Sequence, residues 1–307
     1  MKTTRAYASR MKPFAVLSIA LLLAAGCREE PVEQKPSVDA NQHMDDIRQW
    51  QEKRAERLKA EDGWLSLIGL FWLSEGKNVI SLPSAGSPTL TLTRNGRTVT
   101  LEPDAQMTID GKPVAAPVAL LADADENGPT IVQRGSVRFN VIKRGERYGL
   151  RVKDAQAQTR TQFAGLDYFP TEPKWRVEAR FEPYNPPKKI PIIDVTGMTS
   201  ENISPGALVF TVDGKEYRID PVIEEGSDEL FLIFKDETSR DDTYQAGRYL
   251  YAAKPGADGK TVIDFNKAYN PPCTFTPYAT CPLPPPQNRL PIRVEAGEKR
   301  YHGGDHA

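Results

Sequence analysis

The chain has 307 residues, of which 40 are Lys or Arg and 41 are Asp or Glu, so its formal net charge is −1. This length suffices for one large domain or two ordinary ones with a buried core. The charge balance excludes a polybasic protein that binds nucleic acid or anionic lipid through excess positive charge. Only three His are present, two of them in the last six residues, so neither a His-based metal site nor a Ser-His-Asp triad is expected. We predict no cofactor, no metal and no nucleic-acid partner.

The first 26 residues have the parts of a bacterial export signal. Four basic residues and no acidic residue accompany an apolar run of about a dozen residues that ends at Ala25, too short to span a bilayer well. The string Leu23-Ala-Ala-Gly-Cys27 is similar to a lipobox, in which small residues precede a cysteine that becomes acylated. The sequence therefore predicts a lipoprotein signal peptide over residues 1–26 and lipid attachment at Cys27. An ordinary signal or an uncleaved anchor is the alternative.

Residues 27–43 are expected to form the lipidated cysteine and a flexible tether, because residues 28–42 are polar, contain Pro and have no apolar period. Arg28 follows the cysteine, where enterobacterial sorting rules would need Asp for the inner membrane. That resemblance implies an outer-membrane lipoprotein facing the periplasm, attached to the membrane through the lipid on Cys27. Without residues 1–26 the chain has 36 basic and 41 acidic residues, a net charge of −5, so the mature protein is mildly acidic.

One amphipathic helix is expected near the start of the mature domain, from about Met44 to Lys59, and Asp62-Gly63 would stop it. Its apolar residues recur at three- and four-residue steps or lie close to that stripe: Met44, Ile47, Trp50, Ala55 and Leu58. The apolar run Trp64–Leu73 follows and is too short for a membrane span. Its two Trp are expected in the core rather than as a platform for sugars.

After Gly76 the pattern changes to short strands separated by turn residues. Asn95-Gly96, Asp110-Gly111 and Asp213-Gly214 are signals for type I′ hairpins. Strands are expected at 89–94, 98–101, 137–142, 148–152, 175–181, 207–212, 216–220, 230–234, 247–252 and 261–265. The sequence predicts a mostly-β fold, an antiparallel β-sandwich or barrel with one N-terminal helix and a Pro-rich C-terminal segment. Residues 44–300 are interpreted as a single domain and residues 301–307 as a disordered tail.

The segment Asp264–Pro291 is the most unusual part of the chain, because 8 of its 28 residues are Pro. Each Pro fixes one φ angle and removes one donor, so the segment is stiff without forming a regular ladder. Together with Asp62–Asn78 and Asp236–Leu250, it resembles the DUF1684 family, domains of unknown function in bacteria and archaea. The resemblance extends over about residues 45–300. It implies a recurring domain, often on exported proteins, and carries no catalytic assignment.

Cys273 and Cys281 are eight residues apart. In an oxidising periplasm, a disulfide that closes this small loop is the favoured interpretation. A metal-binding pair is disfavoured, because the spacing is not Cys-x-x-Cys and no internal His is available. Two free thiols, packed as small apolar groups or active in redox chemistry, remain the third interpretation.

Polar residues in the last third of the chain form the candidate ligand site. Asp264 and Asn266 have the spacing that places two side chains on one face of a strand, and Arg248 or Arg289 could clamp a carboxylate or a phosphate. The full set is Asp236, Ser239, Tyr244, Arg248, Asp264, Asn266, Asn270, Asn288 and Arg289. Alternatively, these residues are structural: the loop near 236–242 is solvated, Arg248 pairs with an Asp and the amides satisfy turn backbone.

Three functions remain open from the sequence. The first is a binding or accessory module that holds a small polar or anionic ligand near Asp264–Arg289. The second is a periplasmic hydrolase that uses Asp236, Asp241 or Asp264 as acid–base groups, which would require one carboxyl group with a raised pKa in a dry pocket. The third is a structural envelope protein with no pocket. Two carboxyl groups facing each other in a cleft would favour hydrolysis, whereas an Arg in a cleft would favour anion binding.

Overall fold

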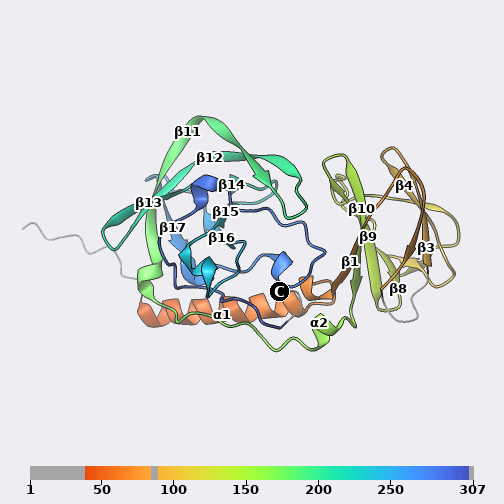
Figure 1. Ribbon diagram of the computed structural model, residues 1–307, viewed down its shortest axis with the longest axis horizontal. Coiled ribbons are helices and arrows are strands. Elements are labelled where there is room, and N and C mark those ends of the chain that lie inside the picture. The colour runs from red at the N-terminus through yellow and green to blue at the C-terminus, as the bar shows by residue number, and fades with distance from the viewer. Residues whose placement is uncertain (1–38, 84–88, 304–307) are drawn as a thin grey trace, which may run out of the picture. The chain divides into compact units, whose positions relative to one another are not determined.

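The computed structural model describes residues 39–83 and 89–303 (Figure 1). The expected signal peptide, the lipid attachment site Cys27 and most of the expected tether lie outside the described residues. The described chain starts with helix α1 (Ala40–Lys59), whose first turn is capped by the Asp39 side chain, which accepts a hydrogen bond from the backbone N of Asn41 at 2.9 Å. The helix therefore begins four residues before the expected start, and His43 belongs to the helix rather than to the tether.

The buried face of α1 differs from the expected apolar stripe. His43, Ile47, Arg54 and Leu58 are buried, whereas Met44 is 52% exposed. His43 and Arg54 each pair with an acidic residue from the C-terminal half of the chain. These two ion pairs turn the helix so that Met44 faces solvent, which hydrophobic periodicity alone did not predict.

Ten strands between residues 67 and 154 form two antiparallel sheets. We refer to residues 64–155 as the N-terminal β region. The region opens with the 3₁₀ turn η1 (Trp64–Ser66). The strands are β1 (Leu67–Trp72), β2 (Gly76–Ser81), β3 (Thr89–Asn95), β4 (Thr98–Glu102), β5 (Thr108–Ile109), β6 (Lys112–Pro113), β7 (Val118–Leu120), β8 (Val132–Arg134), β9 (Val137–Arg144) and β10 (Arg147–Asp154). One sheet has the order β1-β10-β9-β8-β5-β6 and the other the order β2-β3-β4-β7. Side chains of both sheets, such as Leu92 and Leu150, share one hydrophobic core.

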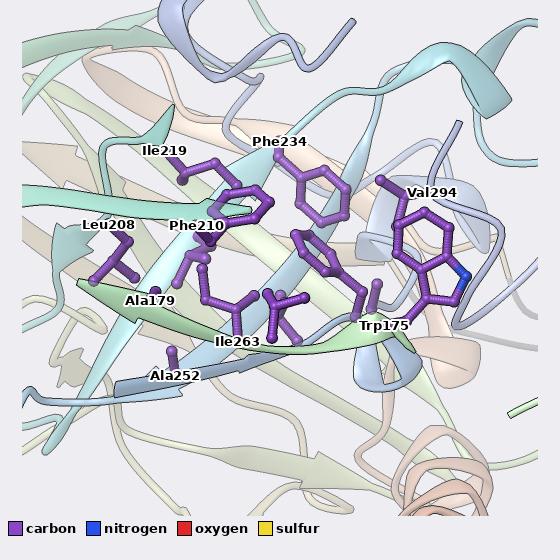
Figure 2. Packing of buried hydrophobic residues seen from close by; sticks show 14 of the residues in the cluster. Trp175, Ala179, Leu208, Phe210, Ile219, Phe234, Ala252, Ile263 and Val294 are labelled. Atoms are coloured by element: carbon purple, nitrogen blue, oxygen red, sulfur yellow. The ribbon is translucent and has the colours of Figure 1, made fainter. Parts of the chain in front are cut away.

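Seven further strands form two more antiparallel sheets in the C-terminal β region, residues 161–303. The short helix α2 (Gln158–Thr161) leads into it. The strands are β11 (Arg176–Ile193), β12 (Thr199–Val212), β13 (Lys215–Ile219), β14 (Val222–Ile223), β15 (Glu229–Phe234), β16 (Arg248–Ala253) and β17 (Lys260–Asp264). Their orders are β13-β12-β11-β17 and β14-β15-β16. Figure 2 shows the shared core, in which the rings of Trp175, Phe210 and Phe234 point into one interior.

The described chain after β17 contains no further strand, only 3₁₀ turns and isolated bridges to the sheets. The density of Pro explains this, because each Pro lacks the N–H that a ladder needs. The 3₁₀ turns of the C-terminal β region are η2 (Pro173–Trp175), η3 (Glu237–Arg240), η4 (Phe265–Lys267), η5 (Pro272–Thr274) and η6 (Pro286–Asn288). Residues 265–303 are therefore held in place by side-chain contacts and isolated bridges rather than by a regular sheet.

The structure confirms a mostly-β, sandwich-like fold with several antiparallel sheets and one N-terminal helix. The turn prediction holds at Asp110-Gly111 and Asp213-Gly214, where both residues have positive φ, as type I′ requires. It is wrong at the first hairpin. Asn95 pairs with Thr98, so the two-residue loop is Gly96-Arg97, and of these only Gly96 has positive φ, at 58°. Glycine with positive φ at the first loop position is the requirement of a type II′ turn.

Candidate ligand-binding cleft

Arg248, an expected anion clamp, lies in the core of the C-terminal β region. Its side chain is 0% exposed, and one Nη atom donates to Asp236 Oδ1 at 3.2 Å and to the backbone O of Val294 at 2.8 Å. Burial lowers the pKa of the Arg248 guanidinium, and the Asp236 carboxylate opposes that shift. Arg248 thus cannot reach a ligand, which corrects the clamp prediction. The alternative prediction, that Arg248 pairs with an Asp, is confirmed.

Asp236 and Ser239 are also buried in this network rather than in a pocket. Asp236 caps η3, accepting from the Thr238 hydroxyl at 2.8 Å, and accepts from the backbone N of Val294 at 2.8 Å. Ser239 is 3% exposed and its Oγ has no hydrogen-bond partner. The loop that follows β15 is therefore not a solvated hairpin at these positions, because its carboxylate is needed to compensate Arg248.

Asp264 and Asn266 are close together, but β17 ends at Asp264 and Asn266 belongs to η4, which corrects the prediction that the two share one strand face; both bond to the protein itself. Asp264 Oδ2 lies 2.7 Å from His43 Nε2, and Asp264 Oδ1 accepts from Asn266 Nδ2 at 2.9 Å. Asn266 also bonds to both backbone groups of Glu172, each at 3.1 Å. Asn266 therefore satisfies loop backbone, and of this pair Asp264 lines the cleft described below.

Asn270 belongs to a second contact that attaches α1 to the C-terminal β region. The backbone N of Asn270 donates to Glu298 Oε2 at 2.7 Å, and Arg54 Nε donates to Glu298 Oε1 at 2.8 Å. Arg54 also donates to the backbone O of Asn270 at 2.9 Å. Glu298 is 0% exposed, so this is a buried, fully engaged ion pair. Asn288 is likewise structural, because its side chain bonds to the backbone N and O of Asp220 at 2.8 and 2.9 Å.

The remaining candidates lie apart from these networks. Arg289 is exposed, and its backbone forms a bridge with Lys235. Tyr244 is half-buried beside Cys273, and burial followed by this neighbour raises the pKa of the Tyr244 hydroxyl. The nine predicted site residues thus do not meet in one cavity, which corrects the predicted convergence.

The structure holds Cys273 and Cys281 as free thiols, so the expected disulfide is not formed in it. The two residues are nevertheless in contact, because the backbone N of Cys273 donates to Cys281 Sγ at 3.1 Å. The thiol–thiol hydrogen bond lowers the pKa of Cys273 and, together with burial, raises that of Cys281. The pair therefore matches the third interpretation, two packed thiols.

The carboxyl groups named for hydrolysis do not face one another. Asp236 is bonded to Arg248 and Asp264 to His43, whereas Asp241 lies at the surface with its carboxylate 3.2 Å from Arg293. Each carboxylate thus has its own cation. This arrangement lacks the paired carboxyl groups that general acid–base catalysis of hydrolysis would use.

A cleft of about 1300 Å³ opens between α1, η1, the ends of β9 and β10, the strands β15 and β16, and the Pro-rich segment. Six aromatic side chains line it: Trp50, Trp64, Phe231, Tyr249, Tyr251 and Tyr269. Three of the rings form a stack, with centroids 4.9 Å apart for Phe231 and Tyr251 and 6.3 Å apart for Tyr251 and Tyr269. The cleft therefore has a flat, partly apolar wall of the kind that receives the body of a small molecule.

Arg151 on β10 is one of several cations that line this cleft without a bonded acidic partner in the described chain, together with Lys53, Arg57, Arg176 and Lys267. It is the one of these five with a buried, unsatisfied nitrogen atom. No hydrogen bond or ion pair of its side chain is found within residues 39–83 and 89–303, and its buried Nε atom is unsatisfied. Its guanidinium carbon lies 5.3 Å from the centroid of the Trp64 ring. Burial, and then the neighbouring Arg144, lower the pKa of Arg151. Arg144 differs, because it is bonded to Asp123 at 2.8 Å and to the Thr280 hydroxyl at 3.2 Å.

Sequence reasoning missed Arg151 and assigned Trp64 to the core. A signal was present, since Arg151 interrupts the apolar alternation of β10 between Leu150 and Val152. An arginine at such a position is commonly solvated, however. Only the tertiary arrangement shows that it faces an aromatic wall built from residues about 80 to 130 positions away.

The fold and the cleft define a mostly-β protein with a cavity that pairs aromatic rings with an arginine. Residues 161–299 match the model of the family described as "Protein of unknown function (DUF1684)", so this segment of the chain is similar to that family. The match covers the C-terminal β region, so the segment Asp62–Asn78, which also suggested the resemblance, lies outside it.

One similar solved structure is the solution NMR structure of an uncharacterised protein from Haloarcula marismortui. It is 32% identical, with 46% of this chain and 78% of that chain covered and a TM-score of 0.39. No curated protein matches the chain. Among the residues that the structure describes, no helix is long and apolar enough to cross a membrane. The same residues contain no group of three or more His, Cys, Asp or Glu arranged to hold a metal ion.

Proposed function

We propose that the protein is a ligand-binding module that holds a small anionic ligand in the aromatic cleft. The observation that carries this proposal is the Arg151 side chain, which lines the cleft without any hydrogen-bond acceptor in the described chain. A buried donor without an acceptor is unfavourable by about 1–3 kcal/mol. An anionic ligand would remove that cost and form charge-assisted hydrogen bonds, bidentate ones with a carboxylate or a phosphate.

The wall of the cleft supports a ligand with a ring or another flat apolar body. The stacked rings of Phe231, Tyr251 and Tyr269 offer such a surface, and ligand sites combine apolar walls with a few placed polar groups. Two acidic residues of the cleft have partners, since Glu224 accepts from the Tyr251 hydroxyl at 2.7 Å and Asp264 is bonded to His43, whereas Glu56, Asp62 and Glu229 also line it. An anion is favoured over a cation because the buried polar atom of the cleft without a partner in the described chain is a donor, Arg151 Nε.

The setting that we propose for this module is the bacterial cell envelope. Its support is the export signal over residues 1–26 and the lipobox-like string that ends at Cys27. A lipid on Cys27 would attach the module to the outer membrane, on the periplasmic side, where it would meet ligands of the envelope. A Cys27→Ala variant that still incorporated labelled fatty acid would contradict the lipid attachment.

Isothermal titration calorimetry with a panel of anions tests the binding proposal. The panel contains phosphate, sulfate, aromatic carboxylates and sugar acids, and the variant is Arg151→Gln. Loss of the charged hydrogen bonds is expected to weaken binding about ten- to a hundredfold, equivalent to about 1.5–3 kcal/mol.

The matched control is Arg147→Gln. Arg147 lies on the same strand and stacks on Trp72 at 3.8 Å, but it does not line the cleft. Its replacement is expected to leave the affinity unchanged. Equal losses in the two variants, or no binding of any anion to the unaltered protein, would contradict the proposal.

A further inference from the structure

A second cavity, of about 300 Å³, lies on the N-terminal β region next to the cleft. Arg138 and Asn140 from β9 and Lys153 from β10 line it, together with Gln133 from β8. Asp62 lines both this cavity and the cleft. The two cavities therefore share a border formed by the segment that joins α1 to η1.

The polar residues of the two cavities occupy one face of the β9–β10 ladder. Asn140 is the register partner of Arg151, and Arg138 is the partner of Lys153. Arg151 and Lys153 are two residues apart, so their side chains point to the same face and their Cα atoms lie about 6.5 Å apart. The ladder thus presents three cations, Arg138, Arg151 and Lys153, and the Asn140 amide in a row that runs from the cleft into the second cavity.

Trp64 contacts the two cations of this row that lie on β10, Arg151 and Lys153. Its ring centroid lies 5.3 Å from the guanidinium carbon of Arg151 and 5.7 Å from Nζ of Lys153. Lys153 Nζ donates to the backbone O of Asp62, and burial followed by Arg151 lowers the pKa of Lys153. Arg138 is bonded to Glu61 at 3.1 Å on the exposed side. An aromatic ring at the border, with a cation in each cavity, describes two adjacent subsites.

We propose that the cleft and the second cavity together bind an acidic oligosaccharide, with one carboxylate at Arg151 and the next at Lys153. This inference rests on the proposed anion binding in the cleft and extends it to a ligand class. Linked sugar acids repeat a charged group and carry rings of mixed polarity, and the row places two cations beside one aromatic ring, that of Trp64. A polyphosphate chain would match the cations and the amides but would make no use of the Trp64 ring.

The test is calorimetric titration of the purified protein with galacturonic acid and with its linear trimer. The trimer is expected to bind at least tenfold more tightly than the monomer. Lys153→Gln is expected to remove most of that gain without changing the affinity for the monomer, whereas Arg151→Gln weakens both ligands. The control is Lys143→Gln, because Lys143 lies on β9 against Tyr148 and lines neither cavity; it should leave both affinities unchanged.

Several outcomes would overturn the inference. Monomer binding that depends on Arg151, with no gain for the trimer, would contradict the second subsite and leave the proposed function intact. Tripolyphosphate that binds more tightly than the trimer would contradict the sugar class. If Lys153→Gln fails to fold, Arg138→Gln takes its place, and an unchanged affinity for the trimer in that variant contradicts the second subsite. Failure of every anion to bind would overturn the proposed function as well.

Discussion

The N-terminal β region keeps most of its charged side chains near the surface, whereas the C-terminal β region places several of them in its interior. Within residues 64–155, the buried polar residues are Ser66 and Asp154. Within residues 161–303, the buried set includes Asp236, Arg248 and Glu298, each with contacts to segments distant in sequence. The strands of the N-terminal region all pair in antiparallel ladders, including β1 with the distant β10, so its backbone is satisfied within regular sheets. The C-terminal region must also fix a Pro-rich segment that has no ladder.

Comparison of the two regions shows which interactions hold in place a segment that cannot form a sheet, here residues 265–303. Within residues 294–299, the carbonyls of Val294 and Gly297 accept from backbone N–H groups, whereas those of Ala296 and Lys299 accept from side chains. Arg248 bonds to the carbonyls of Val294 and Ala296, and Asn270 Nδ2 bonds to that of Lys299 at 2.7 Å. Hydrogen bonds from buried side chains here take the place of the backbone ladder of a strand. Because each buried charge must keep its partners, these bonds fix the position of the segment.

Asp236→Asn is expected to have the largest effect on stability. It would leave the Arg248 guanidinium buried without its counter-charge, and breaking a buried pair in this way costs about 3–5 kcal/mol. The free energy of unfolding from urea denaturation measures the loss.

The corresponding change in the N-terminal region is Asp104→Asn, which removes the partner of Arg134 in a partly exposed pair, 2.7 Å apart. Its cost should stay below about 1 kcal/mol. Similar losses for Asp236→Asn and Asp104→Asn would contradict the contrast between the two regions.

Turn chemistry is expected to be the same in both regions, so Gly111→Ala and Gly214→Ala should cost the same amount. The two glycines have φ values of 74° and 73°, and an added Cβ would meet no atom within 4 Å at either position. The cost is then backbone strain alone, about 1–2 kcal/mol each. Urea denaturation measures both, and a difference of several-fold would show that the tertiary surroundings, not the turn, determine the cost.

The smallest and most local effect concerns the thiol pair, which exists only in the C-terminal region of the described chain. Because the thiol–thiol hydrogen bond lowers the pKa of Cys273 and raises that of Cys281, the Cys273 thiolate should form at lower pH than that of an ordinary cysteine. Iodoacetamide should therefore modify Cys273 first, at a rate that rises with pH, and leave Cys281 protonated and unmodified. Mass spectrometry of protein labelled between pH 6 and 9 measures this, and equal labelling of the two thiols would contradict it.

Local patterns in the sequence predicted much of the fold. Alternating segments with Asp-Gly turns identified the hairpins at 109–112 and 212–215, because strand alternation and turn conformation depend on neighbouring residues. The amphipathic helix was also predicted, but its buried face was not. His43 and Arg54 are buried because Asp264 and Glu298, more than 200 residues away, neutralise them, and periodicity has no access to such partners.

The candidate site was predicted less well for the same reason. Residue types indicated that Arg248 would take an acidic partner, which is correct, but sequence proximity suggested a pocket where the structure has a packed network. Arg151 is the centre of the proposed site because its side chain has no hydrogen-bond acceptor in the described chain. Whether a side chain finds such a partner depends on the whole fold, not on its neighbours in the sequence. The sequence predicted an anion clamp at Arg248 or Arg289, whereas the site that we propose has Arg151 in that role.

The most direct test of anion binding in the cleft is a crystal structure of the protein soaked in selenate, with the anion located by anomalous scattering from selenium. The account predicts a selenate within hydrogen-bond distance of the Arg151 guanidinium, beside the Trp64 ring. Selenate found only on surface arginines such as Arg147, with none at Arg151, would contradict it.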